Sequence, residues 1–140
     1  WMTSRGSAMR SNRYFNIKLT TGLVVVAVMF WGSLQAMAES EMITSGAALF
    51  SANCQTCHGP DGNGNGPVAE TMILKPRDFA LAAFKFDTDA DWERGTDTDL
   101  ENVIKQGTAV FGGSYLMPVW NHLSDDEVTS LIAYIRSLEK

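Results

Sequence analysis

Cysteine and histidine are scarce in this chain of 140 residues, which contains two of each. A tetrahedral zinc site needs four ligands, and beside the clustered Cys54, Cys57 and His58 the sequence offers only His122. A thioredoxin-like redox dithiol needs a βαβ context, and the chain has no convincing run of alternating β-branched residues. Both alternatives for a C-x-x-C pair are therefore disfavoured.

Acidic residues are absent before Glu39. All 16 of them lie from that position onward, together with only seven basic residues, so residues 39–140 carry a formal charge of −9. Nucleic acids select basic surfaces, and this charge therefore argues against nucleic acid binding. It is compatible with a partner protein that has a basic docking surface, and equally with a charge that only keeps the domain soluble.

Long apolar runs are also missing. The longest, Leu19 to Trp31, has 13 residues, whereas a membrane-spanning helix needs about 20. Basic residues precede this run, and Ala36-Met37-Ala38 follows it with the small-x-small pattern of a cleavage site. We therefore expect residues 1–38 to be a signal peptide and residues 39–140 to be the mature domain. Counted to Ala38 the segment reaches 20 residues, so a retained membrane anchor facing the periplasm is the alternative.

What the chain does have is Cys54-Gln55-Thr56-Cys57-His58, the C-x-x-C-H attachment motif of a c-type haem. Two cysteines at this spacing can each form a thioether with one porphyrin vinyl group, and the adjacent histidine then places its imidazole under the iron. Both sulfurs are used, which leaves no free thiol and no disulfide. We predict one haem c attached through Cys54 and Cys57, with His58 as a metal ligand. Because bacteria generally attach this haem after export, the motif and the leader together predict a periplasmic protein.

The opposite face of the iron needs a second occupant, and Met117 is the favoured one. It lies in a loop where Pro118 restricts the preceding backbone to extended geometry, so the thioether can be held in place. Met72 lies in an apolar stretch and is expected to fill core space. Met42 lies at the start of the mature chain, and the other four methionines belong to the export segment. His122 is the rival imidazole, although a solvent-facing residue at a helix entry accounts for it more simply.

Three helical patterns are present, and no sheet is indicated. Apolar residues at helical spacing predict a helix over residues 43–53, and Ser124 with Glu127 forms a capping box that opens a helix reaching Leu138. A second capping box at Thr98 to Glu101 predicts another helix, which should stop at Gly107. The long loops between them contain too much irregular chain for an ordinary core of this size, and a large apolar ligand would resolve the difficulty.

The glycine-rich segment from Gly59 to Gly66 is strongly turn-forming. It completes no phosphate-binding motif. It begins like a calcium loop at Asp61, but Met72 occupies the twelfth position, where a bidentate glutamate is needed. The simplest interpretation is that the glycines let the backbone pass close to the haem plane.

Taken together, these motifs resemble the class I, mono-haem cytochrome c family from Gly46 to Leu138. The resemblance rests on three motifs: Gly46-x-x-Leu49-Phe50 before C-x-x-C-H-G, the Met117-Pro118 loop, and Leu123-Ser124-x-x-Glu127 opening a helix that contains Ala133-Tyr134-Ile135.

It implies an all-α cytochrome c fold of three to five helices and long loops wrapped around one covalently bound haem. In that fold Gly46 and Tyr134 are the close-contact pair where the first and last helices cross. The resemblance also implies that the Pro67 carbonyl accepts a hydrogen bond from His58, and that Arg77 and Trp120 contact the haem propionates. The lysine-rich surface of mitochondrial members is missing.

The leading functional hypothesis is a periplasmic carrier of single electrons, which exchanges them with a donor and an acceptor redox protein. One alternative is a haem c subunit of a larger periplasmic or membrane oxidoreductase. Another is a haem enzyme or gas sensor with an open iron face. No general base, nucleophile or pair of carboxylates is placed convincingly for catalysis, so we expect no catalytic residues. Membrane association is expected only if residues 19–38 are retained.

Overall fold

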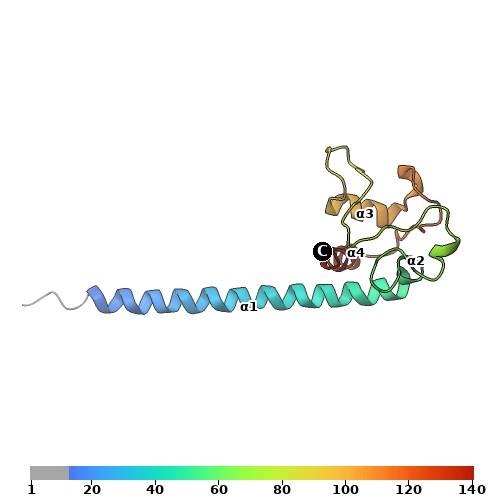
Figure 1. Cartoon of the computed structure of the whole chain (residues 1–140). Coiled ribbons are helices and arrows are strands. Elements are labelled where there is room, and N and C mark those ends of the chain that lie inside the picture. The colour runs from blue at the N-terminus through green and yellow to red at the C-terminus, as the bar shows by residue number, and fades with distance from the viewer. Residues whose placement is uncertain (1–12) are drawn as a thin grey trace, which may run out of the picture. The chain divides into compact units, whose positions relative to one another are not determined.

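The computed structural model describes residues 13–140, with side chains described for Trp31, Gly32 and from Leu34 onward (Figure 1). The chain divides into two compact units, Trp1–Ala38 and Glu39–Lys140. Much of the predicted signal, including Arg5 and Arg10, lies outside the described residues. The prediction that residues 1–38 are removed as a signal peptide stays a prediction.

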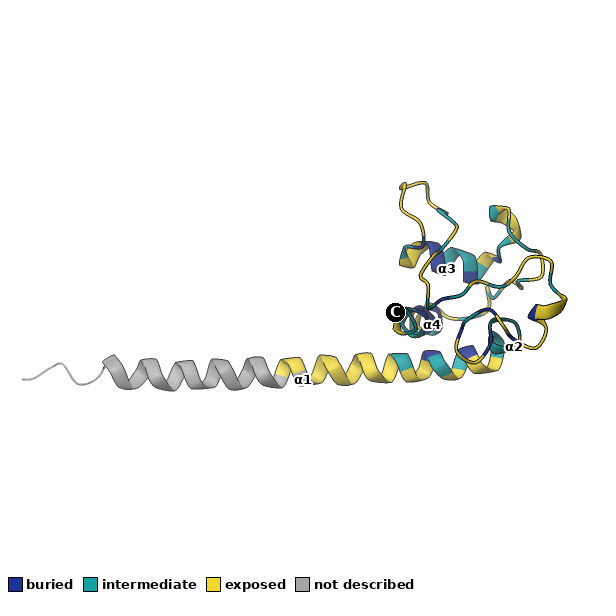
Figure 2. Ribbon diagram, viewed as in Figure 1, coloured by how far each residue is buried: buried dark blue, intermediate teal, exposed yellow. Residues whose placement is uncertain are grey.

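The first helix, α1, runs over Arg13–Asn53 and contains no proline. Its described side chains before Glu39, such as Trp31 and Met37, are exposed, and Figure 2 shows this part of α1 in the colour of exposed residues. Among the helices in the described part of the chain, none combines the length and the apolar character required to cross a bilayer.

The second unit is helical, with long connections. After α1 come a single turn α2 (Gln55–His58), a 3-10 turn η1 (Ala69–Thr71), helix α3 (Asp97–Gln106), a second 3-10 turn η2 (Ala109–Phe111) and helix α4 (Asp125–Ser137) (Figure 1). Residues 13–140 contain no strand. The predicted all-α fold with long loops is therefore confirmed.

The helix ends follow their capping chemistry. The predicted capping box at the start of α4 is confirmed, because the Ser124 side chain accepts from the Glu127 N–H and the Glu127 side chain accepts from the Ser124 N–H. The predicted box at Thr98 is wrong by two residues. Thr96 is the N-cap of α3 and forms the box with Asp99, since an aspartate at this position reaches back to the cap N–H as a glutamate would. Helix α3 stops before Gly107, as predicted.

The end of α1 at Asn53 was predicted correctly, but its beginning was not. The helix continues upstream of Ile43, because residues 34–42 are mostly good helix formers and no proline interrupts them. The periodicity used in the prediction marks only the face that packs on the core, and this face begins near Ile43, where exposure gives way to burial.

The core of the second unit is built from α1, α3, α4 and the loop residue Phe79. Its most buried apolar side chains are Phe50 from α1 and Val128 and Leu131 from α4. Gly46 lets α1 approach α4 closely. A Cβ atom at this position would lie 2.8 Å from the Cβ of Tyr134 and closer still to the carbonyl oxygen of Ser130. The predicted contact between Gly46 and Tyr134 is confirmed.

Candidate functional site

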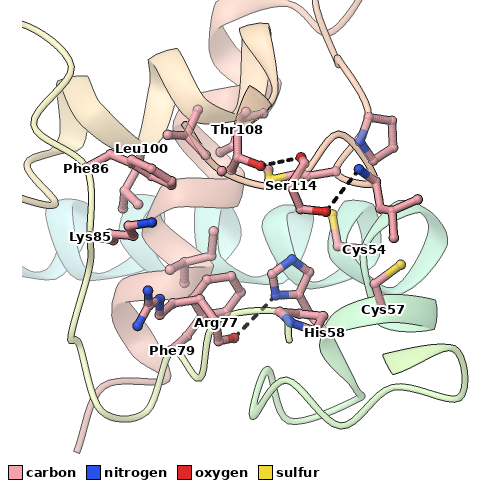
Figure 3. Close-up of a pocket in the computed structure, with 18 of the residues that line it drawn as sticks. Cys54, Cys57, His58, Arg77, Phe79, Lys85, Phe86, Leu100, Thr108 and Ser114 are labelled. Atoms are coloured by element: carbon pink, nitrogen blue, oxygen red, sulfur yellow. Dashed lines mark hydrogen bonds between the residues drawn. The ribbon is translucent and has the colours of Figure 1, made fainter. Parts of the chain in front are cut away.

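A cavity of about 380 Å³ lies inside the second unit, and every helix of that unit contributes to its wall (Figure 3). Most of the lining is apolar, with two long loops, residues 72–86 and 108–120, supplying much of it. Its size is within the range of about 300–1,000 Å³ that is usual for sites of small molecules and cofactors. The long loops, which contain too much irregular chain for an ordinary core of this size, form much of the wall of this cavity.

The two cysteines and the histidine enter the cavity wall from one helical turn. The Cys54 N–H donates to the Phe50 carbonyl at 2.8 Å, and the His58 N–H donates to the Cys54 carbonyl at 2.9 Å. This turn, which continues directly from α1, places Cys54, Cys57 and His58 together in the lining. Burial, and secondarily the neighbouring Cys57, raises the pKa of the Cys54 thiol to about 11.

The glycine-rich segment packs against this turn. The Gly66 N–H donates to the Cys57 carbonyl at 3.1 Å, and the Gly64 N–H donates to the His58 carbonyl at 2.8 Å. A Cβ atom at Gly66 would lie 2.6 Å from the carbonyl carbon of Cys57, so only glycine allows this approach. The glycines therefore hold the backbone of the attachment turn from outside.

His58 is held by the loop that follows. Its ring stacks on Phe79 with centroids 4.7 Å apart and planes 13° from parallel, and its Nδ1 lies 3.4 Å from the carbonyl oxygen of Arg77. Burial of the ring lowers its pKa, although the hydrogen bond to Arg77 acts in the opposite direction. A neutral imidazole is the form that can ligate a metal.

The hydrogen-bond role expected for Pro67 stays a prediction, and the carbonyl that lies beside His58 here is that of Arg77. Pro67 is exposed and does not line the cavity. Because Phe79 stacks on the histidine ring, the backbone just before it is carried past the imidazole, and the Arg77 carbonyl becomes the acceptor. Sequence spacing alone gave no signal for this contact.

Two of the seven methionines line the cavity within the described residues, namely Met117 and Met72. Met72 lines this wall and is not part of the buried core cluster, contrary to the sequence prediction. Met42 is exposed. His122 is also exposed and does not line the cavity, and its ring lies 5.6 Å from that of Trp120.

The loop that carries Met117 is fixed at several points. The Thr108 hydroxyl donates to the Ser114 carbonyl at 2.6 Å, and the Leu116 N–H donates to the Ser114 hydroxyl at 3.1 Å (Figure 3). At the end of the loop, the Trp120 N–H donates to the Ile104 carbonyl at 3.1 Å. By contrast, Met72 is followed by the almost fully exposed Ile73.

Three cations line the cavity, and two of them lie across it from the cysteines. Figure 3 shows Arg77 and Lys85 on one side and Cys54 and Cys57 on the other. Lys75 completes the set, and its ammonium group donates to the Ala69 carbonyl at 2.6 Å. Trp120 lines the cavity as well. Sequence reasoning found Arg77 and Trp120 but missed Lys85, whose neighbours give no motif.

The described lining contains a single carboxylate, Asp99, which is buried. Its oxygens accept hydrogen bonds from the Thr88 N–H and hydroxyl, at 2.5 Å and 2.7 Å, and from the Thr96 N–H at 3.0 Å. Asp99 is thus occupied by local donors, and the open polar groups of the cavity are mainly cationic.

This distribution of polarity fits a haem c. A haem carries its vinyl groups and its two propionates on opposite edges, so a haem held by thioethers at Cys54 and Cys57 would need cationic partners on the far side of the cavity. That side holds Arg77 and Lys85 (Figure 3). The wall between is apolar and suits the porphyrin plane, and a neutral imidazole and a thioether are both available to iron.

Comparisons with known proteins agree with this geometry. Residues 41–135 match the family described as cytochrome C oxidase, cbb3-type, subunit III. The cbb3-type cytochrome c oxidase subunit FixP of Azorhizobium caulinodans is 29% identical over 104 residues, which cover 74% of this chain and 29% of FixP. Subunit CcoP of Cereibacter sphaeroides is 27% identical over 101 residues, covering 71% of this chain and 29% of CcoP.

The chain thus spans 29% of the length of each of these two relatives. Among solved structures, a chain of the Kuenenia stuttgartiensis reducing HAO-like protein complex superposes with a TM-score of 0.58 at 29% identity. The match covers 68% of this chain and 41% of that one.

Proposed function

The chain belongs to the family of cbb3-type cytochrome c oxidase subunit III, and on that basis we propose that it passes single electrons between a donor and an acceptor protein in the periplasm. A chain of this family contains a mono-haem class I c-type cytochrome domain. Its cofactor is haem c, and its role is to carry electrons. The observation that best supports the proposal is one cavity that collects both cysteines, His58 and Met117 in its wall.

We propose that Cys54 and Cys57 attach the haem, and that His58 and Met117 are its axial ligands. The haem supplies an iron centre that changes between two oxidation states. The chain's own contribution would be to hold the iron through the same two side chains, His58 and Met117, in both states, so that little rearrangement accompanies electron transfer. The fixed loop around Met117 supports its assignment over Met72, because a ligand loop that moved would add to that rearrangement.

The remaining polar groups of the cavity have a positioning role. Arg77 and Lys85 neutralise the propionates, for which a guanidinium and an ammonium are well suited, and the Trp120 indole N–H is a further donor. The Arg77 carbonyl, 3.4 Å from Nδ1 of His58, orients the imidazole so that Nε2 faces the metal. The apolar lining excludes water from the ring, which favours the reduced, less charged form.

Replacing the proposed axial methionine tests the site. Met117→Ala should lower the midpoint potential, remove the visible band of thioether coordination and open the reduced iron to carbon monoxide, because methionine opposite histidine raises the potential. Met72→Leu is the matched control inside the cavity, and His122→Ala is the control outside it. Both should keep the native spectrum.

The opposite pattern would reject the assignment. If Met72→Leu abolished the native spectrum and Met117→Ala did not, Met72 would be the ligand. If the unmodified reduced protein bound carbon monoxide rapidly, the iron would have an open face, and the enzyme or gas-sensor hypothesis would replace the carrier.

We also propose that the protein works as part of a larger redox assembly. The relatives FixP and CcoP are oxidase subunits by name and more than three times as long as the matched region, which favours a domain that serves a neighbouring redox centre. Deletion of the gene should then abolish turnover of a co-purifying oxidoreductase. A freely diffusing carrier would leave the turnover of the purified enzyme intact.

A further inference from the structure

The segment around Met117 is unusual in its charge. No aspartate, glutamate, lysine or arginine occurs between Lys105 and Asp125, although 19% of the whole chain is charged. We refer to residues 107–120, the part of this segment between α3 and Asn121, as the charge-free loop. The net charge of −9 on residues 39–140 therefore comes entirely from other surfaces.

The charge-free loop exposes apolar side chains that the haem does not account for. Leu116 and Met117 line the cavity, so a bound haem covers them. Val110, Tyr115 and Val119 do not line it, and they are 66%, 83% and 52% exposed. Three apolar side chains of the loop are thus exposed outside the cavity lining, and two of them, Tyr115 and Val119, lie two residues from Met117 in the sequence.

The loop is also held in one conformation. Besides the bonds of Thr108 and Trp120 already described, the Gly113 N–H donates to the Thr108 carbonyl at 2.8 Å. A surface ordered before contact loses little conformational entropy when a partner binds. An exposed, ordered aromatic such as Tyr115 is typical of the residues that contribute most to protein interfaces.

We propose that the charge-free loop is the surface on which the redox partner docks, and that the partner presents an apolar, uncharged surface to it. This inference rests on the proposed function. A charged group brought against this loop would lose its water without gaining a counter-charge, which makes a basic docking patch unfavourable here. Because Met117 is part of the loop, a partner seated on it comes close to the iron. The expectation of a basic partner, drawn from net charge alone, does not apply to this surface.

An uncharged apolar redox reagent tests the surface without knowledge of the partner. We would use 1,4-benzoquinone, which takes one electron from the ferrous haem to give ferric haem and the semiquinone. Its rate with the reduced holoprotein is measured by stopped flow. Its binding to the oxidised holoprotein, where no electron passes, is mapped by amide chemical shifts. We expect the shifts to be largest in residues 108–119.

Tyr115→Ser and Val119→Ser should each slow the reaction by about twofold to tenfold, the size of one lost aromatic or apolar contact. The matched control is Leu81→Ser, which removes an apolar side chain whose exposure of 72% lies between those of Val119 and Tyr115, and which is not part of the cavity lining. It should leave the rate unchanged. The ratio of variant to native rate should be the same at about 0.1 M and about 1 M salt, because the lost contact is apolar.

Several results would overturn the inference. It fails if Tyr115→Ser and Leu81→Ser behave alike, if the rate ratio changes with salt, or if the shifts map elsewhere. It also fails if the native protein dimerises and Tyr115→Ser does not, because a second copy would then be the occupant. Failure of the proposed function looks different, since the reduced native protein would then bind carbon monoxide rapidly, whatever its rate with the reagent.

Discussion

At the scale of single residues, the most constrained polar group in this protein is Asp99. Its carboxylate is buried and accepts a hydrogen bond from the N–H of Thr96, the N-cap of α3. It also accepts one from the N–H of Thr88, eleven residues away in sequence. Burial alone would raise the pKa of its carboxyl group, but the hydrogen bonds from Thr88 and Thr96 outweigh it and lower the pKa below 3.8. The ionised carboxylate, which can only accept, matches the three donors that Thr88 and Thr96 present to it.

Asp99→Asn should therefore destabilise the second unit by about 1–3 kcal/mol at neutral pH, because the amide NH₂ would replace one of the two oxygens that accept from Thr88 and Thr96. The measurement is urea unfolding of the holoprotein. Asp61→Asn, at an exposed turn position, is the control and should change the free energy of unfolding little.

The comparison of the native protein with Asp99→Asn also predicts how the stability of the protein depends on pH. Since the pKa of Asp99 is lower in the folded state, the folded protein binds fewer protons than the unfolded one in this range. The stabilisation is present above the unfolded pKa of about 4 and is lost as pH falls through the folded value. The difference in the free energy of unfolding between the native protein and Asp99→Asn should therefore become smaller as the pH falls. A gap that stayed constant from neutral pH to about pH 2 would contradict this account.

At the scale of elements, the crossing of α1 and α4 depends on one missing side chain. Gly46→Ala should destabilise the protein by at least about 2 kcal/mol, because the new methyl group would meet the Ser130 carbonyl. Alanine's better helix propensity offsets only about 1 kcal/mol of that. Thermal unfolding of the holoprotein gives the readout.

Ala48→Leu on the same helix is the control, because Ala48 is exposed and leucine is a good helix former. If both variants unfolded at the native temperature, the contact between the helices would be looser than described.

Prediction of the elements succeeded where local chemistry decides and failed where it does not. The sequence predicts where α1 and α3 end, at Asn53 and before Gly107, and where α4 begins, after Ser124. These boundaries are predictable because capping residues act within one turn. The predicted start of α3 is wrong because two threonines, Thr96 and Thr98, are each followed three residues later by an acidic residue that could complete a capping box. Only the folded backbone decides which threonine is the N-cap.

At the scale of the whole molecule, the cavity makes stability depend on the cofactor. A variant with both Cys54→Ala and Cys57→Ala should retain less haem and unfold at a lower temperature, because the apolar wall would lose the contacts that the porphyrin provides. Ser51→Ala, at an exposed position just before the attachment turn, is the control. An unchanged unfolding temperature in the double variant would show that the loops are stable without the ring.

An intact mass of the purified native protein complements this measurement. We expect the mass of residues 39–140 plus one haem, because export and covalent attachment go together. A mass that includes residues 1–38 would instead favour the retained anchor.

The sequence by itself determined the cofactor, its attachment at Cys54 and Cys57 and the all-α class, because thioether spacing, capping boxes and helical periodicity are local properties. Only the tertiary structure decided that the Arg77 carbonyl lies beside His58, that Lys85 joins Arg77 opposite the cysteines, and that Met72 lines the cavity. These contacts depend on how the long loops fold over the cavity. Loop paths are fixed by packing between residues far apart in the chain, on which local patterns carry no information.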